Sequence, residues 1–192
     1  MRGRGQDATS PLIAILVFGL VGGLVSLPIW AGVRIVASIR YGIDCGGHLK
    51  RAADANNIEL AKQELAVATS YLERHGMTAG YTSVLYNEPS EDVGFWHKNL
   101  KVSLQELEKE PATASELEKS NLLLKLRQTL LDTSSGTESV TEPSGISIFP
   151  HNAAYAWWVW ISLLAVVVGF IAALGSGKNR KGKPASHEPA LQ

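Results

Sequence analysis

Two long apolar stretches lie near the ends of this chain, and between them runs a polar segment in which apolar residues recur at helical spacing. The first stretch runs from Leu12 to Val33 and the second from Tyr155 to Leu174, and neither contains Asp, Glu, Lys or Arg. A membrane-crossing helix needs about 20 apolar residues to span a hydrocarbon core of ~30 Å. Each stretch therefore predicts a transmembrane helix.

A cleaved signal peptide is the alternative interpretation of the first stretch, because Arg2 and Arg4 precede it as a basic leader would. The apolar core of a signal peptide is about 7–15 residues long, and a small-x-small cleavage site follows it. The run from Leu12 to Val33 is longer than that, and no such site closes it cleanly. A retained helix is the better prediction.

The flanking charges predict the orientation of the two helices. Lys178, Arg180, Lys181 and Lys183 follow the second helix, whereas no Lys or Arg lies between Arg127 and Tyr155. Basic residues favour the cytoplasmic side, so both termini are expected in the cytoplasm and the central segment outside it. Arg34, Arg40, Lys50 and Arg51 favour the opposite orientation, but they open a long loop, where this rule weakens.

The aromatic residues agree with that orientation. Under it, one outer interface would hold Trp30, Tyr41, Tyr155, Trp157, Trp158 and Trp160. Amphipathic rings are favoured at the membrane–water boundary.

The polar segment predicts about four helices from its apolar spacing and capping residues. The first contains Leu49, Ala52 and Ala53, and the others cover 58–75, 91–109 and 115–131. Asn57 is a suitable N-cap for the second helix, Gly76 a suitable stop, and Ser115 with Glu118 forms a capping box for the fourth. The predicted apolar stripes are Phe95, Trp96, Leu100, Leu104 and Leu107 on the third helix and Leu117, Leu122, Leu124, Leu126 and Leu130 on the fourth.

The expected fold is an all-α membrane protein in which two transmembrane helices flank an extracytoplasmic helical domain. The predicted organisation is a cytoplasmic tail (1–11), a transmembrane helix (12–33), the helical domain (34–132), an extended linker (133–154), a transmembrane helix (155–174) and a basic cytoplasmic tail (175–192). Ile146, Ile148 and Phe149 interrupt the polar linker, and the sequence leaves open whether they pack on the helical domain or lie at the lipid interface.

The segment from His48 to His75 resembles one helix pair of the tetratricopeptide type, through Asn56 to Ala61 followed by Ala68. It lacks the early Trp and closing Pro of that repeat, and no second copy follows at a period of about 34 residues. The resemblance implies a packed helix pair rather than a repeat array.

Composition and motifs indicate no catalytic, cofactor or metal site. Lys plus Arg and Asp plus Glu are 18 each, so the zero net charge predicts no nucleic-acid partner. Cys45 is the only cysteine, which excludes an intramolecular disulfide. With Asp44 and His48 it offers at most three nearby ligands, one fewer than a structural zinc site needs. The roles of Cys45 and His48 stay open between helix packing, an intermolecular disulfide, and metal or nucleophilic chemistry.

Small residues in the apolar runs predict close helix packing. Gly19 and Gly23 form a Gly-x-x-x-Gly pattern, and Ala165, Gly169 and Ala173 repeat at the same spacing. Small residues allow helix backbones to approach each other within a bilayer. The apolar runs contain no charged residue, so a pump or channel formed by this chain alone is not expected.

A candidate binding surface lies in the loop before the third helix and near the start of that helix: Tyr81, Tyr86, Trp96 and His97. Aromatic residues of this kind line binding surfaces, but they also close the cores of small bundles. The sequence leaves both interpretations open.

Two functions fit these features. The first is a non-catalytic, membrane-anchored interaction protein, an accessory or assembly subunit whose partners are the lipid bilayer and either other membrane subunits or further copies of the chain. The second is an extracytoplasmic ligand-binding or sensing module that signals through a partner, because a helical domain between two membrane helices resembles the input half of chemoreceptors. Unlike chemoreceptors, this sequence shows no cytoplasmic output domain.

Overall fold

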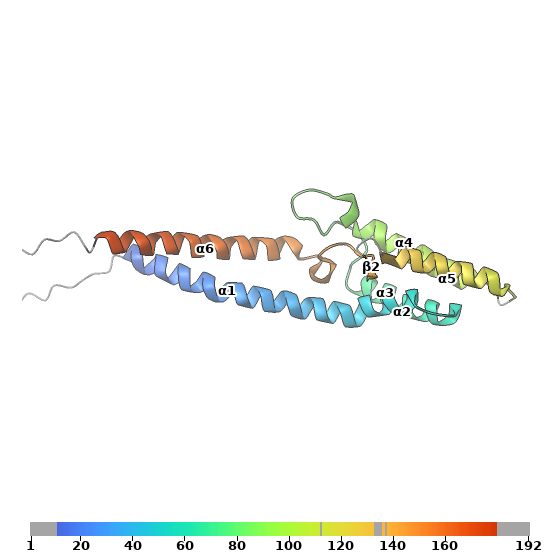
Figure 1. Ribbon diagram of the computed structural model, residues 1–192. Coiled ribbons are helices and arrows are strands. Elements are labelled where there is room, and N and C mark those ends of the chain that lie inside the picture. The colour runs from blue at the N-terminus through green and yellow to red at the C-terminus, as the bar shows by residue number, and fades with distance from the viewer. Residues whose placement is uncertain (1–10, 112, 133–135, 137, 180–192) are drawn as a thin grey trace, which may run out of the picture. The chain divides into compact units, whose positions relative to one another are not determined.

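A computed structural model describes residues 11–179 apart from 112, 133–135 and 137, with side chains described between 15 and 174. The predicted tails 1–11 and 175–192 lie largely outside these residues. Elements follow in the order α1 (Pro11–Tyr41), a π-helical turn (Gly42–Gly46), α2 (Gly47–Ala53), α3 (Ile58–Arg74), a 3₁₀ turn (Pro89–Glu91), α4 (Val93–Lys109), α5 (Glu116–Leu130), β1 (Leu131–Asp132), β2 (Ser139–Val140), a 3₁₀ turn (Ile146–Ile148) and α6 (Asn152–Asn179) (Figure 1). The predicted all-α class is confirmed.

The described residues form two compact units. One, called the helix pair below, contains residues 11–31 of α1 and 157–179 of α6. The other, called the central domain, contains residues 32–156 and therefore α2 to α5.

Two helical segments are long and apolar enough to cross a membrane. They are Ile15–Ala53, whose most apolar window has a mean hydropathy of 2.0, and Asn152–Leu174, with 2.3. Only 6% and 11% of these windows are buried within the protein, whereas the core helix of a soluble bundle would be mostly covered. Soluble monomers rarely expose apolar patches larger than a few hundred Å².

The helix boundaries of the central domain follow from local capping. The Asn57 side chain accepts a hydrogen bond from the Leu60 N–H at 2.8 Å, and Asp92 accepts one from Phe95 at 2.9 Å. Ser115 and Glu118 form the predicted capping box, each side chain accepting from the other's backbone N–H. Because these bonds satisfy backbone groups that a helix leaves unpaired at its first turn, α3, α4 and α5 begin close to the predicted positions.

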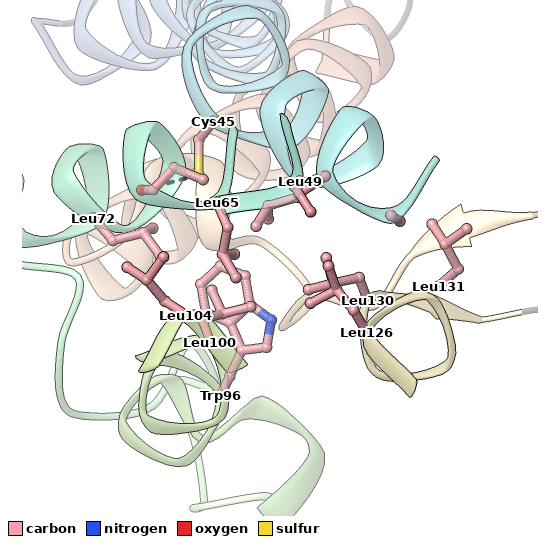
Figure 2. Packing of buried hydrophobic residues seen from close by; sticks show 14 of the residues in the cluster. Cys45, Leu49, Leu65, Leu72, Trp96, Leu100, Leu104, Leu126, Leu130 and Leu131 are labelled. Atoms are coloured by element: carbon pink, nitrogen blue, oxygen red, sulfur yellow. Dashed lines mark hydrogen bonds between the residues drawn. The ribbon is translucent and has the colours of Figure 1, made fainter. Parts of the chain in front are cut away.

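The core of the central domain collects one face from each of its helices. Figure 2 shows Leu65 and Leu72 from α3 directed toward Leu100 and Leu104 of α4, with Leu49 and Leu130 beside them. α2 and α3 pack against each other, as expected, and the core includes the small residues Ala52, Ala53, Ala61 and Ala68.

The predicted apolar stripes of α4 and α5 are partly wrong. Phe95 is 64% exposed, and Val93 is buried in its place. Leu117 and Leu124 are 71% and 54% exposed, whereas Leu126 and Leu130 are buried. α5 carries leucines on more than one face, so only part of this set can face the core.

The segment for which the sequence predicts an extended linker also packs on the central domain. β1 pairs antiparallel with β2, and the Thr141 N–H donates to the Leu130 carbonyl oxygen at 2.8 Å. Ile146 and Ile148 are buried, and Phe149 packs against the core. The structure therefore places these three residues on the domain.

Tyr41 also belongs to this core, being only 4% exposed, so its ring packs against protein rather than lipid. Its ring meets that of Tyr71 edge to face, with 6.2 Å between the ring centres.

Candidate functional site

In the helix pair, α1 and α6 pack closely against each other at two glycines. A Cβ atom on Gly23 would lie 2.7 Å from Val166 Cγ2 and 2.8 Å from the Ser162 carbonyl oxygen. On Gly169 it would lie 2.5 Å from Leu20 Cβ and 2.9 Å from the Leu16 carbonyl oxygen. Neither position tolerates a side chain without separating the helices.

The other three small residues predicted for helix packing lie in different surroundings. A Cβ on Gly19 would meet no atom within 4 Å, so this position is open. Ala165 is half-buried and Ala173 is exposed. The contact thus brings together one glycine from each predicted pattern.

Three polar side chains connect the same helices through a closed set of hydrogen bonds. Trp158 Nε1–H donates to Ser26 Oγ at 2.7 Å, and the Ser162 hydroxyl donates to the Trp158 carbonyl oxygen at 2.8 Å. Ser26 Oγ lies 2.8 Å from Ser162 Oγ, and because the Ser162 proton is already engaged, Ser26 is the donor. Sequence reasoning missed this network, although a lone serine in each apolar run was a signal for it.

In the central domain, Glu64 of α3 is buried between two basic groups of α2. Its Oε2 lies 2.6 Å from His48 Nδ1, and its other oxygen pairs with the Arg51 guanidinium. Glu64 is 7% exposed, and a carboxylate is stable at such a site only when it is paired. The contacts of Glu64 with His48 and Arg51 therefore connect α3 to α2.

Cys45 is fully buried, and its thiol donates to the Ala68 carbonyl oxygen at 3.8 Å (Figure 2). Reagents and substrates have no direct access to the sulfur. Among the described residues, His, Cys, Asp and Glu side chains form no group of three or more that could hold a metal ion. The geometry gives Cys45 and His48 packing roles in different contacts.

Glu142 is held against α1 by a long-range hydrogen bond. The Tyr41 hydroxyl donates to Glu142 Oε2 at 2.9 Å, across 101 positions of sequence. Loss of hydration raises the pKa of Glu142, and the bond from Tyr41 opposes that rise. The residue as a whole is exposed, so its carboxyl group remains reachable from solvent. It lines an open depression of about 340 Å³ together with Arg34 and Ser38.

The four residues of the candidate binding surface do not share one environment. Tyr86 is 72% exposed and Tyr81 36% exposed. A Cβ atom added to the neighbouring Gly80 would lie 3.4 Å from the Phe149 ring. Trp96 is buried in the core, where its Nε1–H donates to the Thr141 carbonyl oxygen at 2.7 Å. His97 is mostly covered, with its side chain 13% exposed.

Burial lowers the pKa of His97, although the nearby Glu73 carboxylate, 3.9 Å from Nε2, partly opposes the shift. An unfolded histidine titrates near pH ~6.5, so below that pH the unfolded chain binds more protons than the folded one. Stability is therefore expected to fall as the pH decreases through about 6.5 toward the lower pKa of the folded state.

The variant His97→Gln is expected to flatten this part of the stability curve, because it removes the group that titrates. Urea unfolding of the detergent-solubilised chain at a series of pH values, followed by circular dichroism, measures the slope. An unchanged slope in His97→Gln would assign the pH dependence to other groups.

The turn between α2 and α3 carries two open depressions. One, of about 360 Å³, is lined by Arg51, Leu60 and Glu64, and the other, of about 400 Å³, lies between the first turns of α3 and α5. Asn56 lines both. The exposed Leu117 and Leu124 lie seven residues apart on α5, so they share one face of it.

Comparisons of this chain with protein-family models, with curated proteins and with solved structures found no match.

Proposed function

We propose that this chain is a non-catalytic, membrane-anchored interaction protein that serves as an accessory or assembly subunit of a membrane complex. Its two long apolar helices cross the cytoplasmic membrane, both termini lie in the cytoplasm, and the central domain is presented outside. The partners are other membrane subunits or further copies of the chain.

The membrane anchor is supported by the apolar surface of the helix pair. Phe18 of α1 is 84% exposed, and α6 likewise exposes Ile161, Leu164 and Ile171. Lipid would cover such side chains, and the charges that follow each apolar run would remain in water.

The interaction role depends on one observation, the second apolar face of α5. Leu117 and Leu126 are nine residues apart, which places them on opposite sides of a helix with 3.6 residues per turn. Leu126 is buried in the core of the domain, and Leu117 is exposed together with Leu124. The depression of about 400 Å³ adjoins this helix at Glu116, Lys119 and Ser120. A partner helix packed on the face that carries Leu117 and Leu124, beside this depression, would bury both leucines.

Co-purification of the full chain in mild detergent tests this role. The double variant Leu117→Ser and Leu124→Ser is expected to lower recovery of the associated chain by at least about tenfold, which corresponds to ~1.4 kcal/mol. Two differently tagged copies of the chain, expressed together, show whether that associated chain is a second copy.

Val102→Ser on α4 is the matched control, because Val102 is a similarly exposed apolar residue on another helix. It is expected to leave recovery unchanged. If the α5 double variant recovered as much of the associated chain as the wild type does, this would contradict the proposed interface and favour the sensing function instead.

A further inference from the structure

A second open site of the central domain lies where α1 meets the segment after β2. It is the depression of about 340 Å³, and its polar lining comes from Arg34, Ser38 and Tyr41 on one side and from Glu142 and Ser147 on the other. These two sides are about a hundred residues apart in sequence and contribute charges of opposite sign.

The carboxylate of Glu142 is held in place by a hydrogen bond, but no positively charged side chain among the described residues pairs with it. The Tyr41 hydroxyl fixes one of its carboxylate oxygens at 2.9 Å, and Glu142 forms no ion pair with any residue that the structure describes. Tyr41 itself is buried, so it holds the carboxylate in a defined place at the wall of the depression. A carboxylate in this arrangement can accept charge-assisted hydrogen bonds from an ammonium group.

Arg34 supplies the opposite charge to the same depression. A guanidinium donates paired hydrogen bonds to phosphate oxygens, and the hydroxyls of Ser38 and Ser147 add further donors on the lining. A ligand that carries both a phosphate and an amine would satisfy both walls at once.

The position of Arg34 identifies where such a ligand is found. It is the first charged residue after the apolar run that ends at Val33, so in the membrane-anchored arrangement proposed above it lies at the level of the lipid headgroups. Ile35 and Ile146 line the depression beside the polar groups and suit the glycerol end of a lipid.

We propose that this depression binds the phosphoethanolamine headgroup of a phospholipid, with the phosphate on Arg34 and the ammonium on Glu142. The inference rests on the proposed membrane anchoring, but not on the α5 interface. In this site, Glu142 distinguishes lipids that carry an amine from anionic lipids that lack one.

Native mass spectrometry of the delipidated full chain in detergent tests this site. Phosphatidylethanolamine and phosphatidylglycerol with identical acyl chains are added back separately. The wild-type chain is expected to bind phosphatidylethanolamine about tenfold more tightly, and Glu142→Gln, which retains an acceptor for Tyr41, is expected to abolish that preference while binding phosphatidylglycerol as before. Arg34→Gln is expected to weaken binding of both lipids.

Glu108→Gln, at an exposed carboxylate on α4, is the matched control and should behave as wild type. Equal binding of the two lipids by the wild-type chain, or an unchanged preference in Glu142→Gln, would overturn the proposal. If free glycerophosphoethanolamine bound as tightly as the lipid, the occupant would be a soluble compound, and this result would also overturn the proposal.

These outcomes are separable from the proposed function. Partner recovery reports on the α5 face, and the side of the membrane on which the domain lies is measured by labelling in cells. Lipid discrimination in detergent depends on neither result.

Discussion

Gly23→Leu and Gly169→Leu are each expected to separate α1 from α6 in the helix pair. A Cβ atom alone would come within 3 Å of the opposite helix at either position, and on both it would meet a backbone carbonyl oxygen, which cannot rotate away. Helices in lipid gain no hydrophobic stabilisation from pairing, so loss of close contact removes the main source of their association.

Disulfide formation between Ser26→Cys and Ser162→Cys measures that contact, because the native hydroxyl oxygens are only 2.8 Å apart. Cleavage within the central domain followed by non-reducing electrophoresis shows whether the two helices are linked. The yield is expected to fall by about tenfold when Gly23→Leu or Gly169→Leu is added, a change of ~1.4 kcal/mol in the pairing.

Gly19→Leu is the matched control, since it introduces the same side chain one helical turn away into open space. It should leave the yield of cross-linked product unchanged. If all three leucine variants gave the same yield, the glycines would not determine how the helices pack.

Trp96→Ala is expected to produce the largest loss of stability in the central domain. The indole fills the core beside Leu65, Leu100 and Leu104 and also donates a hydrogen bond to the Thr141 carbonyl oxygen, which ties α4 to the segment around β2 (Figure 2). Truncation of a buried Trp to Ala typically lowers the free energy of unfolding by about 3–5 kcal/mol.

Urea unfolding of the solubilised chain, followed by circular dichroism, provides the measurement. Trp96→Phe keeps most of the ring and loses the hydrogen bond, so it should lower the free energy of unfolding by only about 1–3 kcal/mol. Phe95→Ala removes the neighbouring aromatic residue, which is 64% exposed, and should have little effect. Equal losses for Trp96→Ala and Phe95→Ala would contradict the assignment of Trp96 to the core.

The helix boundaries could be predicted because the bonds that set them are local. Asn57 and Ser115 each cap a backbone N–H three residues ahead, and Gly76 adopts a left-handed φ of 67° after α3. Such signals involve only neighbouring residues, so they can be read without knowing what the helix packs against.

The rotation of each helix about its axis could not be predicted in the same way. Gly19 and Gly23 are equivalent within their sequence pattern, yet only Gly23 faces the other helix. The leucines of α5 are equally apolar, and the positions of α2 and α3 decide which of them are covered. Both outcomes depend on neighbours that are distant in sequence.

Long-range polar contacts were the least predictable part of the candidate sites. Ser26 and Ser162 are 136 residues apart, and Tyr41 and Glu142 are 101 apart. Within its own segment, none of these residues signals a distant partner, because serine in an apolar run and glutamate in a polar one are common. Only the folded chain brings their oxygens within hydrogen-bonding distance.

Thiol labelling in intact cells tests the central claim, that two membrane crossings present the domain outside the cytoplasm. Cys45 is the only cysteine and is fully buried, so the wild-type chain should not react with a membrane-impermeant maleimide. Tyr86→Cys, at an exposed loop position, is expected to label in intact cells, whereas a cysteine added after Gln192 should label only after the membrane is permeabilised. Labelling of the C-terminal cysteine in intact cells, or of Tyr86→Cys only after permeabilisation, would contradict the account.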